Sequence, residues 1–224
     1  MLGALRAAIS FFTTIKLDGD FESFRRNLWL TPFVGILIGL IVSIPKIFDI
    51  PHSQFFCLLI YVAVEGINHI DGLADFGDAF FAPKDRKKKA LKDLNLGAGG
   101  VIFVSMYFLS LYHFLRYVEF EDLIFSQFLA KYVMLLFLVF SKPAWEGMAS
   151  ELMKFSKKRD VFVGFLPFFF FLDQEKILIL IISIIIFLLI KKYSEINFGG
   201  VNGDVIGASN CITFSTSLIF SSLL

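Results

Sequence analysis

Residues 176–190 read Lys-Ile-Leu-Ile-Leu-Ile-Ile-Ser-Ile-Ile-Ile-Phe-Leu-Leu-Ile, with no charge after the first residue. An apolar run of this kind approaches the length that an α-helix needs to cross a bilayer. Similar candidate spans lie elsewhere in the chain, at 28–48, 53–70, 98–118, 123–140 and 205–224. The sequence therefore predicts an all-α fold, a polytopic integral membrane bundle with about six or seven transmembrane helices.

Composition supports this class. Hydrophobic residues make up 57% of the 224 residues and charged residues only 18%, with 30 Phe and a mean hydropathy of +0.75. These values exclude a disordered chain and disfavour an ordinary soluble domain. The net charge of +1 gives no reason to expect a nucleic-acid partner.

Charged residues are sorted between the connecting segments. Fifteen of the 21 Lys and Arg residues lie in segments 18–27, 71–97, 141–160 and 191–204. The intervening connections at 49–52, 119–122 and 173–175 contain acids and no Lys or Arg. The positive-inside rule therefore places the four basic segments on the cytoplasmic side of the cell membrane. This alternation requires 161–190 to cross twice, although 161–172 is short for a span, and it leaves the C-terminus outside.

The N-terminal segment and the two cysteines indicate no further domain or cross-link. Residues 1–17 lack a signal-peptidase pattern and predict a retained helix that is interfacial or half-inserted. Cys57 and Cys211 stand alone in apolar stretches, which indicates neither a disulfide framework nor a zinc site. No repeat or linker divides the chain, so residues 1–224 are expected to form one integral-membrane domain.

An acidic cluster follows the second candidate span. Asp71, Asp75 and Asp78 are spaced four and then three residues apart, which places them within roughly 60° of one helix face. Crowded carboxylates repel one another unless a cation neutralises them, and oxygen ligands favour Mg²⁺ or Mn²⁺ over zinc. The cluster therefore predicts a metal site for phosphoryl transfer. The alternative is a set of solvated acids paired with the lysines that follow.

Residues around the cluster are candidates for the same site. Asn68 lies beside the acidic arc, His69 precedes it, and Gly72 would let a helix or a nucleotide approach closely. Glu65 and Lys131 are ionisable groups within candidate spans, which makes each a functional suspect, although a buried ion pair between them would explain both.

Two further segments contain polar and glycine residues next to spans. In the first, Lys92 and Asp93 precede Gly97 and could contact an anionic substrate, although a juxtamembrane Lys run is more often a topology anchor. In the second, Gly203 and Gly207 flank Asp204 at the start of the last span. This segment could present backbone N–H groups to phosphate and add a metal ligand, or it could be a simple turn.

The motifs together resemble the cobalamin synthase family over nearly the whole chain. The resemblance is carried by His69-Ile-Asp71-Gly-Leu-Ala-Asp75 with Asp78, by Lys92-Asp93 with Gly97, and by Gly203-Asp204-Val-Ile-Gly207-Ala208. Residues 8–13 and 32–39 also match. The chain departs from the family pattern at Leu94, Asn95, Lys131 and Cys211.

The resemblance implies a Mg²⁺-dependent transferase of late cobalamin biosynthesis. It would join adenosylcobinamide-GDP to α-ribazole, or to α-ribazole 5′-phosphate, with release of GMP. Asp71, Asp75, Asp78 and Asp204 would be metal ligands, and Asp78 or His69 would be the catalytic base. The residues expected to contact substrate are Asn68, Gly72, Lys92, Asp93, Gly97, Lys131, Gly203 and Gly207.

Other functions remain open from the residues alone. A CDP-alcohol phosphotransferase also uses spaced aspartates at a membrane boundary, but its motif expects an Arg where Asp75 stands. A prenyltransferase would need a second aspartate-rich motif. A secondary transporter could use Glu65 and Lys131. The expected partners are the two substrates and the lipid bilayer, and assembly as a homo-oligomer or with other corrinoid-assembly enzymes stays open.

Overall fold

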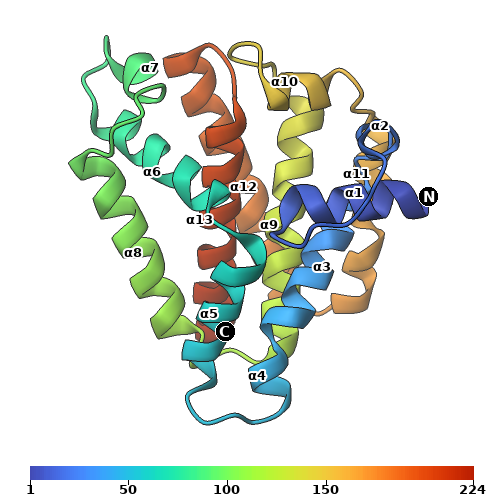
Figure 1. Ribbon diagram of the computed structural model, residues 1–224. Coiled ribbons are helices and arrows are strands. Elements are labelled where there is room, and N and C mark those ends of the chain that lie inside the picture. Colours follow the sequence, from blue (N-terminus) through green and yellow to red (C-terminus); the bar gives the residue numbers. More distant parts are fainter.

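The computed structural model describes residues 1–224 and consists of helices joined by short connections (Figure 1). This confirms the all-α prediction. The α-helices are α1 (Leu2–Phe12), α2 (Phe21–Arg25), α3 (Leu30–Val42), α4 (Ile44–Ile47), α5 (Ser53–Glu65), α6 (Asn68–Phe81), α7 (Lys87–Ala90), α8 (Ala98–Phe114), α9 (Phe120–Phe140), α10 (Met148–Met153), α11 (Lys158–Phe165), α12 (Gln174–Phe198) and α13 (Gly203–Leu223), and a 3₁₀ helix, η1, covers Leu166–Phe171.

Helix α9 lies at the centre of the bundle. All of its residues from Leu123 to Leu138 are buried, and α3, α11, α12 and α13 surround it. Helices α9, α12 and α13 are each long and apolar enough to cross a membrane, whereas α1, α3 and α8 are shorter apolar helices. A membrane bundle is confirmed, and the figure of six or seven crossings stays a prediction.

Two predicted spans are interrupted. The span predicted for 28–48 divides into α3 and α4 at Ser43. The span predicted for 53–70 is wrong at its end, because α5 stops at Glu65 and α6 continues at an angle of 93° to it. Gly66 makes this turn with φ 77°, a left-handed conformation that favours glycine.

Because α5 ends at the break, its last carbonyl groups have no partner within the helix, and Thr14 of the N-terminal segment donates hydrogen bonds to two of them. The backbone N–H of Thr14 donates to the Val64 carbonyl at 2.8 Å, and the Thr14 hydroxyl donates to the Ala63 carbonyl at 2.6 Å. Unpaired carbonyls are costly in an apolar medium, so this contact stabilises the turn between α5 and α6. Helix α1 itself lies across the bundle and not along it (Figure 1).

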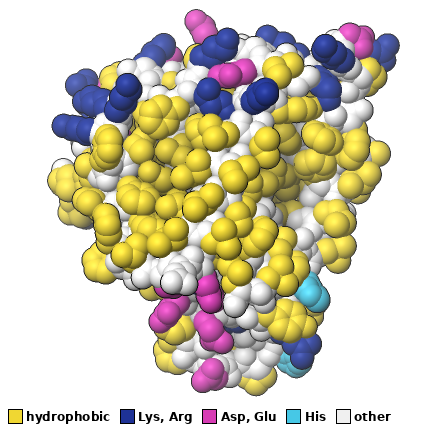
Figure 2. All heavy atoms as spheres, turned by 180° about the vertical axis from the view of Figure 1, so that it is seen from behind, with side chains coloured by type: hydrophobic (Ala, Val, Ile, Leu, Met, Phe, Trp, Pro, Cys, Tyr) yellow, Lys and Arg dark blue, Asp and Glu magenta, His cyan; other side chains and the backbone are white.

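The outer surface has an apolar belt between two charged ends. Figure 2 shows most Lys and Arg side chains at one end, with a few Asp and Glu side chains among them, and a group of Asp and Glu side chains toward the other end, with hydrophobic side chains between. Helix α12 contributes large exposed side chains to the apolar surface, among them Ile181, Ile185, Leu188 and Leu189. An apolar surface of this extent suits contact with lipid.

Candidate active site

Helix α6 is the platform of the site. Its buried face consists of apolar and small residues, including Ile70, Leu73 and Phe76. The predicted arrangement of the aspartates on one helix is confirmed: Asp71 is exposed, and Asp75 and Asp78 are half-buried. The amphipathic pattern of α6 therefore directs its acids away from the core.

A fourth aspartate reaches this group from α13. A Cβ on Gly72 would lie 2.8 Å from the Asp204 carbonyl oxygen, and a Cβ on Gly207 would lie 3.2 Å from the Cα of His69. Small residues at these two points let α6 and α13 approach closely. Asp204 thereby lies close enough to act electrostatically on both Asp71 and Asp75. The structure thus brings Asp204 near Asp71 and Asp75, and its predicted role as a metal ligand stays a prediction.

Asn202 fixes the start of α13 beside this group. Its side-chain oxygen accepts from the Val205 N–H at 3.1 Å, and its amide nitrogen donates to Asp204 Oδ2 at 2.5 Å. The N-terminal cap and the orientation of Asp204 therefore depend on the same side chain.

Asp78 has a structural role that the sequence did not predict. Its Oδ2 accepts from the Gly97 N–H at 2.7 Å and its Oδ1 from the Gly100 N–H at 2.8 Å. The carboxylate therefore satisfies the first N–H groups of α8, where negative charge also complements the helix dipole. A Cβ on Gly97 would lie 2.5 Å from Asp78 Oδ1, so the glycine is needed for this contact.

Behind the aspartates lies a buried polar network centred on Glu65. Glu65 Oε1 accepts from Lys131 Nζ at 2.6 Å, from His69 Nδ1 at 2.7 Å and from Asn210 Nδ2 at 2.6 Å. Lys131 Nζ also donates to Asn210 Oδ1 at 2.8 Å. The proposed ion pair between Glu65 and Lys131 is confirmed, and it holds His69 through Nδ1.

A cavity of about 500 Å³ adjoins this network and the aspartates. Asn68, His69, Asp71, Gly203 and Asp204 line it, so five of the sequence-predicted residues meet there. Its other walls come from α1, α9 and α10. Asp71 also lines a second hollow of about 350 Å³, together with Asp75.

Comparison with known proteins assigns the chain to a family. The family model described as cobalamin-5-phosphate synthase matches residues 4–222. The chain belongs to the cobalamin-5-phosphate synthase family. This membership agrees with the resemblance seen in the motifs, and it favours a synthase over a CDP-alcohol phosphotransferase or a transporter.

Curated relatives of this synthase family match the chain almost from end to end. An adenosylcobinamide-GDP ribazoletransferase of Archaeoglobus fulgidus is 52% identical over 97% of this chain and 96% of its own length. Proteins of the same name from Pyrococcus furiosus and Methanocella arvoryzae are 32% and 31% identical, over 96% and 94% of this chain and 97% and 91% of their own lengths. No solved structure matches the chain.

Several predicted substrate contacts of this synthase lie outside the cavity. Gly72, Gly97 and Gly207 are at close helix contacts. Lys131 is wholly buried in the network with Glu65, so its predicted contact with substrate is not seen in the structure and stays a prediction.

Lys92 and Asp93 lie together on another part of the surface. They line a shallow hollow after α7, where Lys92 Nζ is 4.3 Å from the centre of the Trp145 ring. Hydrogen bonds from the backbone and side chain of Asn95 hold the pKa of Asp93 below its usual value. Their predicted role in binding substrate remains untested.

Sequence reasoning missed Asn210 and the contribution of α1. A polar residue within the last span was the available signal for Asn210, because such residues are costly in a membrane unless they have a partner. Ser10, Phe12 and Lys16 line the cavity from the N-terminal segment. Only the path of α1 across the bundle brings them there, and no local pattern predicts it.

The donor set fits Mg²⁺ in chemistry, although no three His, Cys, Asp or Glu side chains lie close enough together to hold a metal ion. Asp71, Asp75 and Asp204 offer only oxygen atoms, and none of the three forms an ion pair with Lys, Arg or His. Mg²⁺ is usually bound by one or two carboxylates together with substrate phosphates and water. A complete protein cage is therefore not required.

Proposed function

We propose that this protein joins adenosylcobinamide-GDP to α-ribazole, or to its 5′-phosphate, and releases GMP. The product would be adenosylcobalamin or its 5′-phosphate. A ribose hydroxyl oxygen forms a bond to the cobinamide-linked phosphorus, and the bond from this phosphorus to the oxygen that bridges it to GMP breaks. The hydroxyl proton passes to a base of the protein, and GMP leaves with the bridging oxygen.

One observation supports this proposal above the others. Asp71, Asp75 and Asp204 gather from two helices without a basic partner, beside a cavity that can enclose a small substrate. Unpaired carboxylates at the edge of an apolar bundle are costly and are retained where they have a function. Phosphoryl transfer depends mainly on positioning and on neutralisation of charge, which suits such a site.

Mg²⁺ is proposed as the cofactor, held by one or two of the carboxylates of Asp71, Asp75 and Asp204 together with substrate phosphates. The motif also predicts Asp78 as a ligand. When bound, it would neutralise the phosphate oxygens and favour departure of GMP. His69 is better placed than Asp78 as the base. His69 lines the cavity and is held through Nδ1, whereas both oxygens of Asp78 accept backbone hydrogen bonds.

We further propose that the protein lies in the cell membrane and that its active site opens on the cytoplasmic side. Helices α7 and α10 lie at the same end of the bundle (Figure 1), and the segments around them are rich in Lys and Arg. Basic segments of this kind are retained on the cytoplasmic side.

The reaction can be tested with protein in membranes, using adenosylcobinamide-GDP, α-ribazole and Mg²⁺, and measuring GMP release. Asp71→Asn, Asp75→Asn and Asp204→Asn are each expected to lower the rate by about 100-fold or more, because each removes a charge that acts at the reacting phosphate. Asp18→Asn, at an exposed aspartate outside the cavity, is the matched control and should keep the wild-type rate. Wild-type rates in all three site variants would contradict the proposal.

A further inference from the structure

The cavity beside His69 has two chemically different walls. One wall is polar and consists of Asn68, His69, Asp71 and Asp204. The other wall is apolar and comes from α9 and α10, with Met134, Leu138, Met148 and Leu152. A ligand that fits both walls has a flat apolar part at one end and hydroxyl groups at the other, because buried apolar area and satisfied polar groups must both be provided.

The volume of the cavity can be compared with the sizes of the two substrates, adenosylcobinamide-GDP and the nucleoside acceptor. A volume of about 500 Å³ lies within the range of pockets for small molecules and encloses one nucleoside. A corrin ring with its side chains and an attached guanosine diphosphate is far larger and requires an open surface. The nucleoside acceptor therefore fits as a whole within the cavity, whereas the donor could place only its guanosine part there.

Asp71 lines both this cavity and the second hollow, which includes Asp75. A hydroxyl group at the polar wall of the cavity and a phosphate group at the edge of the second hollow could therefore both lie near Asp71.

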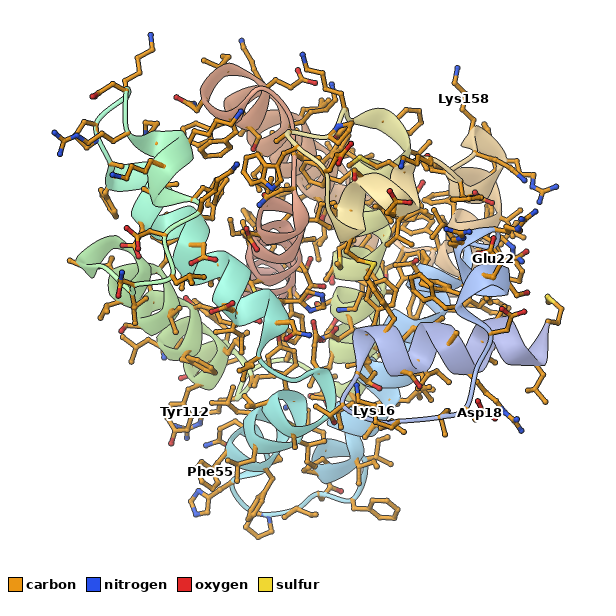
Figure 3. All side chains as sticks on the ribbon, turned by 45° about the horizontal axis from the view of Figure 1, so that its top comes forward. Lys16, Asp18, Glu22, Phe55, Tyr112 and Lys158 are labelled. Atoms are coloured by element: carbon orange, nitrogen blue, oxygen red, sulfur yellow. The ribbon has the colours of Figure 1, made fainter.

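Lys16 is the only basic side chain that lines the cavity apart from His69. It is exposed, forms no ion pair, and follows the C-terminal end of α1 on the loop that runs beneath this helix (Figure 3). Asp71 and Asp204 make the rest of the polar wall acidic. A phosphate group on the acceptor would therefore be attracted to the positive charge of Lys16.

We infer that this cavity is the acceptor subsite, with the aromatic base against Met134, Leu138, Met148 and Leu152, and the ribose toward Asp71. Lys16 then receives the 5′-phosphate when the acceptor has one. The inference rests on the proposed function, and it assigns to the N-terminal segment and α10 a role in choosing the acceptor.

The test compares Michaelis constants for the two substrates in full-length protein. Met148 is 56% exposed, so Met148→Trp can fill the cavity without disturbing the core. It is expected to raise the KM for α-ribazole about tenfold or more and to leave the KM for adenosylcobinamide-GDP unchanged. Met106→Trp is the matched control, because Met106 is 60% exposed on α8 and does not line this cavity.

Lys16→Gln tests whether Lys16 receives the 5′-phosphate of the acceptor. The substitution should not disturb folding, since this side chain is exposed. It should raise the KM for α-ribazole 5′-phosphate several-fold and leave the KM for α-ribazole unchanged. Equal effects on the two acceptors, or none on either, would overturn the role of Lys16.

The outcomes separate this inference from the proposed reaction. A Met148→Trp protein with a raised KM for adenosylcobinamide-GDP and an unchanged KM for α-ribazole would overturn the acceptor subsite, and so would an equal effect of Met106→Trp. Wild-type protein that releases no GMP from the two substrates would instead contradict the proposed function itself.

Discussion

Glu65 concentrates three hydrogen-bond donors on one carboxylate oxygen in the interior of the bundle. Its Oε2 is buried without a partner, so the charge of Glu65 depends on the contacts at Oε1. A buried ion pair gives little net stability over apolar residues, but removal of one partner leaves an uncompensated charge. The pair therefore acts chiefly to hold His69 and Asn210 in place behind the cavity.

At the residue scale we predict that Glu65→Gln and Lys131→Met each destabilise the protein by about 3–5 kcal/mol. The double variant should lose less than the sum of the two, because neither charge then remains alone. Thermal unfolding in detergent measures these differences. Glu151→Gln, which breaks the exposed pair between Glu151 and Lys154, is the control and should leave stability nearly unchanged. Strict additivity of the two buried changes would contradict the coupling.

At the element scale, α8 has Gly97 at its N-cap position and therefore no side-chain cap of its own. Asp78 supplies this cap from α6 and so joins the two helices. The two hydrogen bonds of Asp78 also fix the C-terminal part of α6 relative to the rest of the site. Asp78 is therefore a positioning residue, and this role is independent of metal binding.

We predict that Asp78→Ala lowers stability by about 2 kcal/mol, because two backbone N–H groups lose a charged acceptor. Asp85→Ala, at an exposed position shortly after α6, is the control and should leave stability unchanged. Thermal unfolding in detergent again provides the measurement. An Asp78→Ala protein that is as stable as the wild type would show that the cap is dispensable.

At the scale of the whole molecule, α11 and η1 together connect the basic segment 141–160 to the acidic connection 173–175. The separation of basic and acidic ends in Figure 2 agrees with a chain that crosses between these two segments. Neither α11 nor η1 is long enough to span alone, so the crossing would depend on both elements and on their packing against α9.

We predict that Lys158→Cys and Glu175→Cys react with a membrane-impermeant maleimide from opposite sides of sealed vesicles. Lys158 should react from the cytoplasmic side and Glu175 from the outer side. The two native cysteines, Cys57 and Cys211, are buried and should give a low background. Labelling of both positions from the same side would exclude a crossing between them.

The sequence by itself predicted the helical membrane class and the helix with Asp71, Asp75 and Asp78. It also offered the pairing of Glu65 with Lys131, as an alternative to a functional role for each. These features follow from composition, from the helical period and from the cost of a buried charge, which are all local or pairwise properties. The break at Gly66 was not predicted, because an apolar stretch does not reveal whether its backbone bends.

Only the tertiary structure decided which predicted residues share a site. It brought Asp204 to Asp71 through the contact of Gly72 with α13, it assigned Asp78 to the start of α8, and it buried Lys131. It also placed Lys16 and the apolar wall of the cavity, which are far apart in the chain. The physical reason is that close helix crossings depend on the shape of both partners at the point of contact, and one segment contains only half of that information.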